Sequence, residues 1–298
     1  MDHPYLSELI KELSQIELRH LRLYKDQVLL DTYDSRPMER LNQYSITKNA
    51  LTLLCGMLVD EGRIDPDDRL MRAFPEYKES APKQWRQVTL RHLLTMSVGL
   101  EAAHLMYDYR RSHPQEDWLA LAFSFEPVNN PGEHFLYSNV EPYLLGLWMD
   151  RLLNGELEKF AQTRLFDPLS IGQVKWEHDR NDRIFGGSGL MLNTEELARL
   201  GFLCLREGEY EGNRLVSKEW LSRALSPQIR TGRRGAGYAD YGWFFWIDRH
   251  GSYRMSGKDG QILLNIPALG VTFACNANEP HDGQIVRSFW DHVYPLLK

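Results

Sequence analysis

Strand-like sequence lies at the two ends of this chain, and helix-like sequence lies between them. Residues 4–18 have helical apolar spacing, and "LRLYKD" and "QVLLDTYD" then alternate around a polar turn, which predicts a β-hairpin. From about Tyr241, short aromatic and β-branched runs are separated by turns at residues 249–251, 258–260 and 267–270, which predicts an antiparallel meander. A last amphipathic stretch, "QIVRSFWDHVYPLL", predicts a closing helix.

The middle of the chain, roughly residues 65–235, has helical periodicity and loops marked by glycine and proline. This order predicts an α+β fold, in which one antiparallel sheet is built from both chain ends and flanked by helices. We expect residues 1–44 and 236–298 to form the sheet-containing subdomain. Residues 45–235 are then a mainly helical subdomain, with the active site at the junction.

The composition excludes several classes of function. A net charge of −6 without a Lys/Arg-rich run is unsuited to binding nucleic-acid phosphates. The longest apolar stretch, Ala50–Val59, is far shorter than the roughly 20 residues that cross a bilayer, and the N-terminus lacks a secretory pattern. The three cysteines, Cys55, Cys204 and Cys275, lie in apolar segments, which is typical of free thiols in a reducing compartment. We therefore expect a cytoplasmic protein with no nucleic-acid or membrane partner.

The sequence gives no sign of a metal or a cofactor site. The ten histidines show no paired metal-ligand spacing, and no glycine-rich phosphate loop follows a predicted strand. We expect no metal, no cofactor and a small-molecule substrate.

The stretch "NQYSITKNALTLLCGMLVDEGRI" places Ser45 and Lys48 three residues apart at the start of an apolar helix, on one helix face. A serine hydroxyl needs a base to become a nucleophile, and a lysine becomes a base only when burial lowers its pKa from about 10.4. The apolar surroundings of Lys48 favour that role. Ser-x-x-Lys also arises by chance, and a second copy, Ser80 to Lys83, lies in the polar, proline-broken segment "KESAPKQW", which we interpret as a loop.

Two later segments add polar groups. In "PGEHFLYSNVEPYLLG", Tyr137 could act as a general base beside a lysine, and the Asn139 amide could orient a lysine or a substrate. The alternative is a plain helix cap. In "YRMSGKDGQILL", Ser256 and Gly257 end a strand, and the N–H of Lys258 could form an oxyanion hole with that of Ser45. The alternative is an ordinary hairpin turn.

Taken in order, these three motifs resemble those of the serine β-lactamase and penicillin-binding-protein superfamily, in its class C-like branch. The stretches "VTLRHLLTMSVGL" and "FGGSGLMLNTEELARLGFLCLREGEYEGNRLVSKEW" also resemble that branch. "SGKDGQILLNIPALGVTFACNAN" is most similar to the ending of its esterases and 6-aminohexanoate-oligomer hydrolases. The resemblance implies that Ser45 is the nucleophile, Lys48 its partner and Tyr137 the general base. It places Asn139, Ser256, Gly257 and Lys258 around the substrate and the oxyanion.

One departure bears on the substrate. Met255 stands where the third motif of the family has a lysine or histidine that helps to recognise a carboxylate. Lys258 or Arg254 could substitute for it, but strand alternation places Arg254 on the opposite face from Met255. The resemblance therefore implies a serine hydrolase that cleaves an ester or amide through an acyl-enzyme on Ser45, rather than a β-lactamase or a D,D-carboxypeptidase. The alternative is a sensor or binding module that turns nothing over. Loops around residues 100–130, 175–190 and 230–240 are expected to set the substrate.

Overall fold

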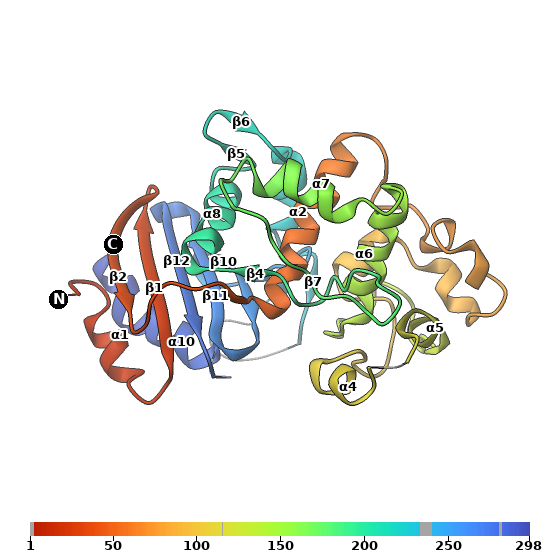
Figure 1. Ribbon diagram of the computed structural model, residues 1–298, viewed down its shortest axis with the longest axis horizontal. Coiled ribbons are helices and arrows are strands. Elements are labelled where there is room, and N and C mark those ends of the chain that lie inside the picture. The colour runs from red at the N-terminus through yellow and green to blue at the C-terminus, as the bar shows by residue number, and fades with distance from the viewer. Residues whose placement is uncertain (1–2, 115, 233–239, 280–281) are drawn as a thin grey trace.

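The computed structural model describes residues 3–298 except 115, 233–239 and 280–281. Its main sheet is antiparallel and joins both ends of the chain, as predicted (Figure 1). The strand order is β2-β1-β12-β11-β10-β9-β8-β7. In chain order these strands are β1 (Leu18–Lys25), β2 (Val28–Asp34), β7 (Ile229–Arg230), β8 (Asp240–Tyr241), β9 (Trp246–Ile247), β10 (Tyr253–Gly257), β11 (Gln261–Ile266) and β12 (Val271–Ala277).

The predicted N-terminal hairpin and C-terminal meander are both present. Strands β1 and β2 are joined by Asp26 and Gln27, whose φ angles of +50° and +66° fit the right-handed strand twist. Two small pairs lie outside the main sheet: β3 (Leu41–Asn42) with β4 (Met191–Leu192), and β5 (Glu209–Tyr210) with β6 (Asn213–Arg214).

The helices cover both faces of the sheet and fill the middle of the chain. They are α1 (Ser7–Glu12), α2 (Thr47–Asp60), α3 (Leu90–Leu94), α4 (Tyr107–Ser112), α5 (Trp118–Ser124), α6 (Val140–Leu152), α7 (Leu157–Ala161), α8 (Thr194–Leu205), α9 (Lys218–Ala224) and α10 (Asp282–Ser288). Helix α1 is shorter than the predicted helix over residues 4–18, because the chain turns after Leu13 to enter β1. Leu13 and Ile16 nevertheless remain buried.

Each face of the sheet has its own apolar layer. Helices α1 and α10 cover one face, where Leu9, Leu21, Phe273 and Phe289 belong to one buried cluster. Helix α8 packs on the other face, against β12, β11 and β1 (Figure 1). Gly201 permits this approach, since a Cβ there would lie 2.8 Å from a methyl carbon of Leu263. How the chain divides into subdomains stays a prediction.

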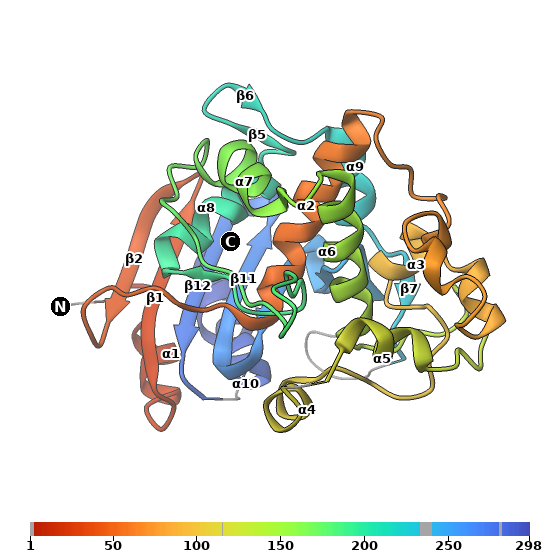
Figure 2. The same ribbon diagram turned by 45° about the vertical axis from the view of Figure 1, so that its right-hand side comes forward.

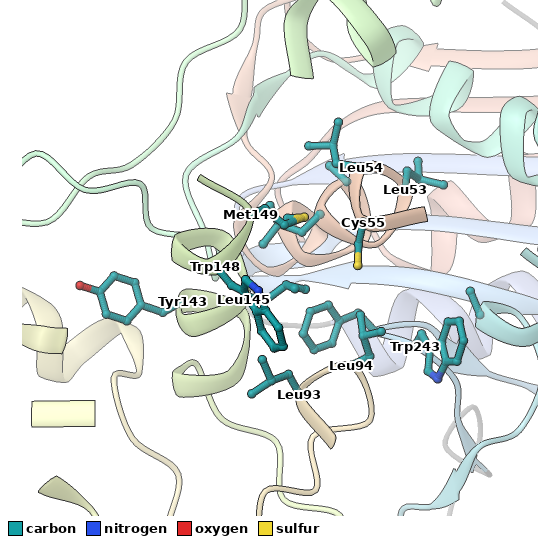
Figure 3. Close-up of a cluster of buried hydrophobic side chains, with 14 of the residues drawn as sticks. Leu53, Leu54, Cys55, Leu93, Leu94, Tyr143, Leu145, Trp148, Met149 and Trp243 are labelled. Carbon is teal, nitrogen blue, oxygen red and sulfur yellow. The ribbon is translucent and has the colours of Figure 1, made fainter. Parts of the chain in front are cut away.

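Helix α2 is buried along almost its whole length, as its apolar sequence predicts. It lies beside α6 (Figure 2), and the two helices contribute to one apolar cluster with residues of α3 (Figure 3). Cys55 is part of this cluster, and all three cysteines are free and buried. Burying α2 fixes its N-terminus, and with it the position of Ser45.

Two helices begin with a capping box. Thr89 and His92 form a capping box before α3, and Asn193 and Glu196 form another before α8. Within the described part of the chain, every helix is too short or too polar to span a bilayer.

Candidate active site

A pocket of about 290 Å³ brings the predicted site residues together. It opens where the start of α2 meets the end of β10, the loop before α6 and helix α4. The sequence-predicted residues that line it are Ser45, Tyr137, Asn139, Ser256, Gly257 and Lys258. The seventh predicted residue, Lys48, lies behind this lining and is hydrogen-bonded to Ser45. The second Ser-x-x-Lys copy is elsewhere, with Ser80 and Lys83 exposed on the surface.

Ser45 lies in a helical turn, Tyr44–Ile46, that leads directly into α2. The turn is entered through Tyr44, whose φ of +45° is rare for a residue with a side chain. The Asn42 side-chain oxygen accepts a 2.7 Å hydrogen bond from the Tyr44 N–H and helps to hold this conformation. Non-glycine residues in this region cost of order 1–3 kcal/mol and cluster at functional sites. The strain lies immediately before the candidate nucleophile.

Lys48 is 1% exposed, and its Nζ has two close oxygen neighbours. The Ser45 Oγ and the Gly187 carbonyl oxygen each lie 2.8 Å from it. Burial holds the pKa of Lys48 well below its ordinary value; Arg110 lowers it further, while Glu141 and Glu177 oppose the change. A neutral amine donates to Gly187 and keeps a lone pair for the Ser45 hydroxyl proton. The geometry therefore fits a base beside a nucleophile.

Tyr137 lies on the pocket side of Lys48. The Lys48 Nζ is 5.1 Å from the centroid of the Tyr137 ring. Trp246 stacks on that ring at 5.7 Å with an interplanar angle of 20°. The tryptophan thus limits the movement of the phenol relative to the amine, and Trp246 itself lines the pocket.

Asn139 directs its amide to the pocket rather than to a cap. It occupies the position before α6, but its side chain makes no capping hydrogen bond; instead the Ser138 Oγ accepts from the Val140 N–H at 3.2 Å. The Asn139 Nδ2 donates to the Leu105 carbonyl at 3.0 Å. Its Oδ1 is buried and has no hydrogen-bond partner among the described residues. The capping alternative therefore applies to Ser138, and the Asn139 oxygen is available to a ligand in the pocket.

The third motif lies at the end of β10. Gly257 packs against the backbone before Ser45, and a Cβ there would lie 2.3 Å from the Gln43 carbonyl oxygen. The buried Arg254 donates from Nη1 to the Ser256 Oγ at 3.0 Å, so it shares a face with Ser256. Met255 is fully buried in the core, which agrees with the predicted alternation. Lys258 Nζ lies 4.3 Å from the Tyr107 ring centroid at the edge of the pocket.

Sequence reasoning did not find several further residues of the pocket. Arg110 lines it although it is 3% exposed, and it donates to Glu177 through Nε and Nη2. Ser188 also lines it, with a buried hydroxyl that has no hydrogen-bond partner in the described part of the chain. Ser188 is the serine of the "FGGSG" loop, but nothing in the composition of that loop identified it as a pocket residue. Tyr44 and Tyr107 add aromatic surface, their ring centroids 5.8 Å apart.

The site offers no evident place for a metal ion. Among the residues that the structure describes, no three His, Cys, Asp or Glu side chains are grouped as ligands. The chemistry available in the pocket is that of Ser45, Lys48, Tyr137 and the surrounding N–H and amide groups.

The chain belongs to the β-lactamase family, whose sequence model matches residues 23–293. It is 28% identical over 130 residues to a β-lactamase of Escherichia coli, covering 44% of this chain and 33% of that protein. It is 22% identical over 236 residues to the 6-aminohexanoate-dimer hydrolase of Paenarthrobacter ureafaciens, covering 73% of this chain and 59% of that enzyme. The chain thus spans between a third and three fifths of the length of these two curated relatives.

Solved structures support the same fold. EstCE1, a hydrolase with promiscuous acyltransferase activity, superimposes with a TM-score of 0.74 at 14% identity, covering 96% of both chains. The relatives and structural neighbours therefore include hydrolases, and the predicted resemblance to the hydrolase branch of the superfamily is confirmed.

Proposed function

We propose that this protein is a serine hydrolase that cleaves an ester or amide bond of a small molecule through an acyl-enzyme on Ser45. One observation carries the proposal: the Ser45 hydroxyl lies 2.8 Å from the amine of a lysine that is buried and holds a lowered pKa. A buried amine of this kind supplies the base that a serine nucleophile needs.

Acylation begins when the Ser45 oxygen attacks the substrate carbonyl carbon. Because Lys48 is the group hydrogen-bonded to Ser45, the hydroxyl proton passes to its amine as the new C–O bond forms. The negative oxygen is held by the backbone N–H groups of Ser45 and Lys258. Both residues line the pocket and lie in the first residues of helical turns, where backbone N–H groups lack intrahelical partners.

The leaving group departs with a proton, which the Tyr137 hydroxyl, replenished by Lys48, delivers to it. Deacylation reverses the roles: the same pair takes a proton from water, the hydroxide attacks the ester carbonyl, and Ser45 leaves with that proton. Lys48 and Tyr137 titrate as one unit in both half-reactions. Asn139 presents its unpaired oxygen to an N–H of the substrate or to the attacking water.

The substrate we propose is not a β-lactam or a D-Ala-D-Ala peptide. At the place where the related enzymes carry a lysine or histidine, Met255 is buried in the core. The pocket is instead lined by aromatic side chains, among them Tyr44, Tyr107 and Trp246. These surfaces favour an ester or amide with an apolar or aromatic group.

The test combines covalent labelling with turnover. A fluorophosphonate should add one phosphonyl group to the protein, seen by intact mass, and none to a Ser45→Ala variant. A panel of p-nitrophenyl esters and anilides should be hydrolysed by the wild type and not by the variant. Absence of an adduct on the wild type refutes the nucleophile. A p-nitrophenyl acyl adduct that never hydrolyses shows a sensor instead, and nitrocefin turnover at rates typical of a dedicated β-lactamase refutes the proposed substrate.

We also propose a cytoplasmic location. The three free, buried cysteines support it, since a reducing compartment keeps thiols in this form. Fractionation of cells that express the full-length protein tests it, and recovery in an exported fraction contradicts it.

A further inference from the structure

Glu141 is a buried acid that the proposed chemistry does not yet use. It is the second residue of α6, and its side chain is 1% exposed. Neither carboxyl oxygen has a hydrogen-bond partner among the described residues. An ionised carboxylate in such a place costs several kcal/mol unless a positive charge compensates it. Burial accordingly raises the pKa of Glu141 to about 7, although its own backbone, the Ser138 side chain and the charge of Lys48 each oppose the rise.

The position of Glu141 follows from the packing of two helices. Helix α6 begins directly after Tyr137 and Asn139, both of which line the pocket. It packs against α2, which carries Lys48 (Figure 2). Apolar side chains of both helices, among them Leu54 and Met149, belong to one buried cluster (Figure 3). Glu141 and Lys48 are each 1% exposed, so solvent screens the interaction between their charges only weakly.

Three charged side chains affect the pKa of Lys48, and Glu141 is the one for which the described residues provide no ion-pair partner. Arg110, on α4, lowers the pKa of Lys48, and Glu177, in the loop after α7, raises it. These two neutralise each other, because Arg110 Nη2 donates to a Glu177 oxygen at 3.1 Å. The ring of Tyr137 is the remaining neighbour, with its centroid 5.1 Å from the amine. A change in the charge of Glu141 should therefore change the pKa of Lys48.

We propose that Glu141 is a positioning residue that acts through Lys48, its carboxylate stabilising the ammonium that forms when Lys48 takes the proton of Ser45. The inference rests on the proposed function. In this step the Ser45 O–H bond breaks and a Lys48 N–H bond forms, while Glu141 gains and loses no proton. Lys48 then combines two properties that conflict in a buried amine: it is neutral before attack, and its charged form is tolerated afterwards.

The electrostatic claim is tested on the resting protein, without any substrate. Lysines carrying ¹³C at Cε are titrated by NMR, and the Lys48 signal is assigned by its loss in a Lys48→Arg variant. In Glu141→Gln, the titration midpoint of Lys48 should fall by about one pH unit, the usual effect of losing an opposite charge nearby. Glu141→Met should move it in the same direction, which covers a failure of either variant to fold. Glu196→Gln, which alters an acid that is 8% exposed and paired with Arg40, should leave it unchanged. Equal midpoints in the wild type and the Glu141 variants overturn the proposal.

The catalytic claim is tested by the rate at which a fluorophosphonate modifies Ser45 as a function of pH. In Glu141→Gln the acidic limb of this profile should move to lower pH by the same amount as the NMR midpoint. In Glu141→Asp, which keeps the negative charge, the limb should lie close to its wild-type position. A merely structural role would lower the rate at every pH and leave the limb in place, which overturns the proposal. If the NMR midpoint shifts but Ser45 never reacts with the fluorophosphonate, the coupling between Glu141 and Lys48 is supported and the proposed hydrolase function is overturned.

Discussion

The chain contains Ser-x-x-Lys twice, and the two copies lie in opposite surroundings. Ser45 and Lys48 lie at the start of α2, where the lysine is 1% exposed and 2.8 Å from the serine. Ser80 and Lys83 lie on either side of Pro82, and both are exposed. The residue spacing is the same in both motifs, but their backbone conformation and their exposure to solvent differ.

The difference shows what the motif itself contributes. Spacing places two side chains on one helix face, but it does not change the basicity of an amine. Water stabilises an exposed ammonium fully, so a surface lysine keeps its proton at neutral pH. Lys48 is desolvated by the helices around it and has its pKa lowered. The buried copy should therefore react, and the exposed copy should be inert.

The largest effect should come from replacing Ser45, and the same replacement at Ser80 should have none. Ser45→Ala should lower ester hydrolysis by at least about 10³-fold, because the acyl-enzyme can no longer form. Ser80→Ala is the matched control and should hydrolyse the same ester at the wild-type rate. The measurement is steady-state hydrolysis of a p-nitrophenyl ester together with mass analysis of the phosphonylated protein. Equal rates for Ser45→Ala and the wild type would show that the reaction takes place elsewhere.

The two lysines extend the comparison. Lys48→Met should reduce kcat by about 10²- to 10³-fold, the usual contribution of a general base, since the apolar replacement suits the buried site. Lys83→Met should have no effect on kcat. Stopped-flow acylation separates the chemical step from binding. If Lys48→Met changed KM alone, Lys48 would be a binding residue and not the base.

A substitution at Gly257 tests whether the buried Ser-x-x-Lys motif depends on close packing between β10 and the turn that holds Ser45. In Gly257→Ala the new methyl would lie 2.3 Å from the Gln43 carbonyl oxygen, and nothing flexible can move aside. We expect a loss of about 3 kcal/mol in the free energy of unfolding. Gly283→Ala is the control, because a Cβ there meets nothing within 4 Å. The measurement is urea unfolding of both variants. Equal unfolding midpoints would show that the Gln43 backbone moves to accommodate the methyl group without a loss of stability.

Local patterns predicted the parts of the molecule that depend on local forces. The hairpin and the meander follow from the alternation in their strands, and helix α2 follows from a long apolar run. The pairing of both chain ends followed from having strands at each end. The candidate residues Ser45, Tyr137 and Lys258 were found through ordered motifs, and the structure places them in one pocket.

The residues that were missed depend on packing between distant segments. Arg110 and Arg111 are neighbours in "YDYRRSH", yet Arg110 is buried at the pocket and Arg111 is exposed. No periodicity over so short a helix distinguishes the two. Glu141 looks in the sequence like an ordinary acid in the first turn of a helix. Only the contact of α6 with α2 shows that this turn is buried beside a lysine.

The smallest effect expected concerns how the charge of Glu141 changes stability with pH. Its pKa is about 7 in the folded protein and near 4.5 when unfolded, so the folded state binds more protons between these values. The resulting stabilisation is fully present below the unfolded pKa and is lost as the pH rises through the folded pKa. From pH 5 to pH 8 the wild type should therefore lose roughly 2 kcal/mol relative to Glu141→Gln.

Urea unfolding of the wild type and Glu141→Gln at pH 5, 6, 7 and 8 gives this difference directly. Lys48 is present in both proteins, so most of its own titration cancels from the comparison. Glu196→Gln, which removes a buried acid paired with Arg40, is the control and should not reproduce the pattern. If the difference between wild type and Glu141→Gln were constant over this pH range, Glu141 would remain ionised throughout. Lys48 would then face an ionised carboxylate at every pH in this range.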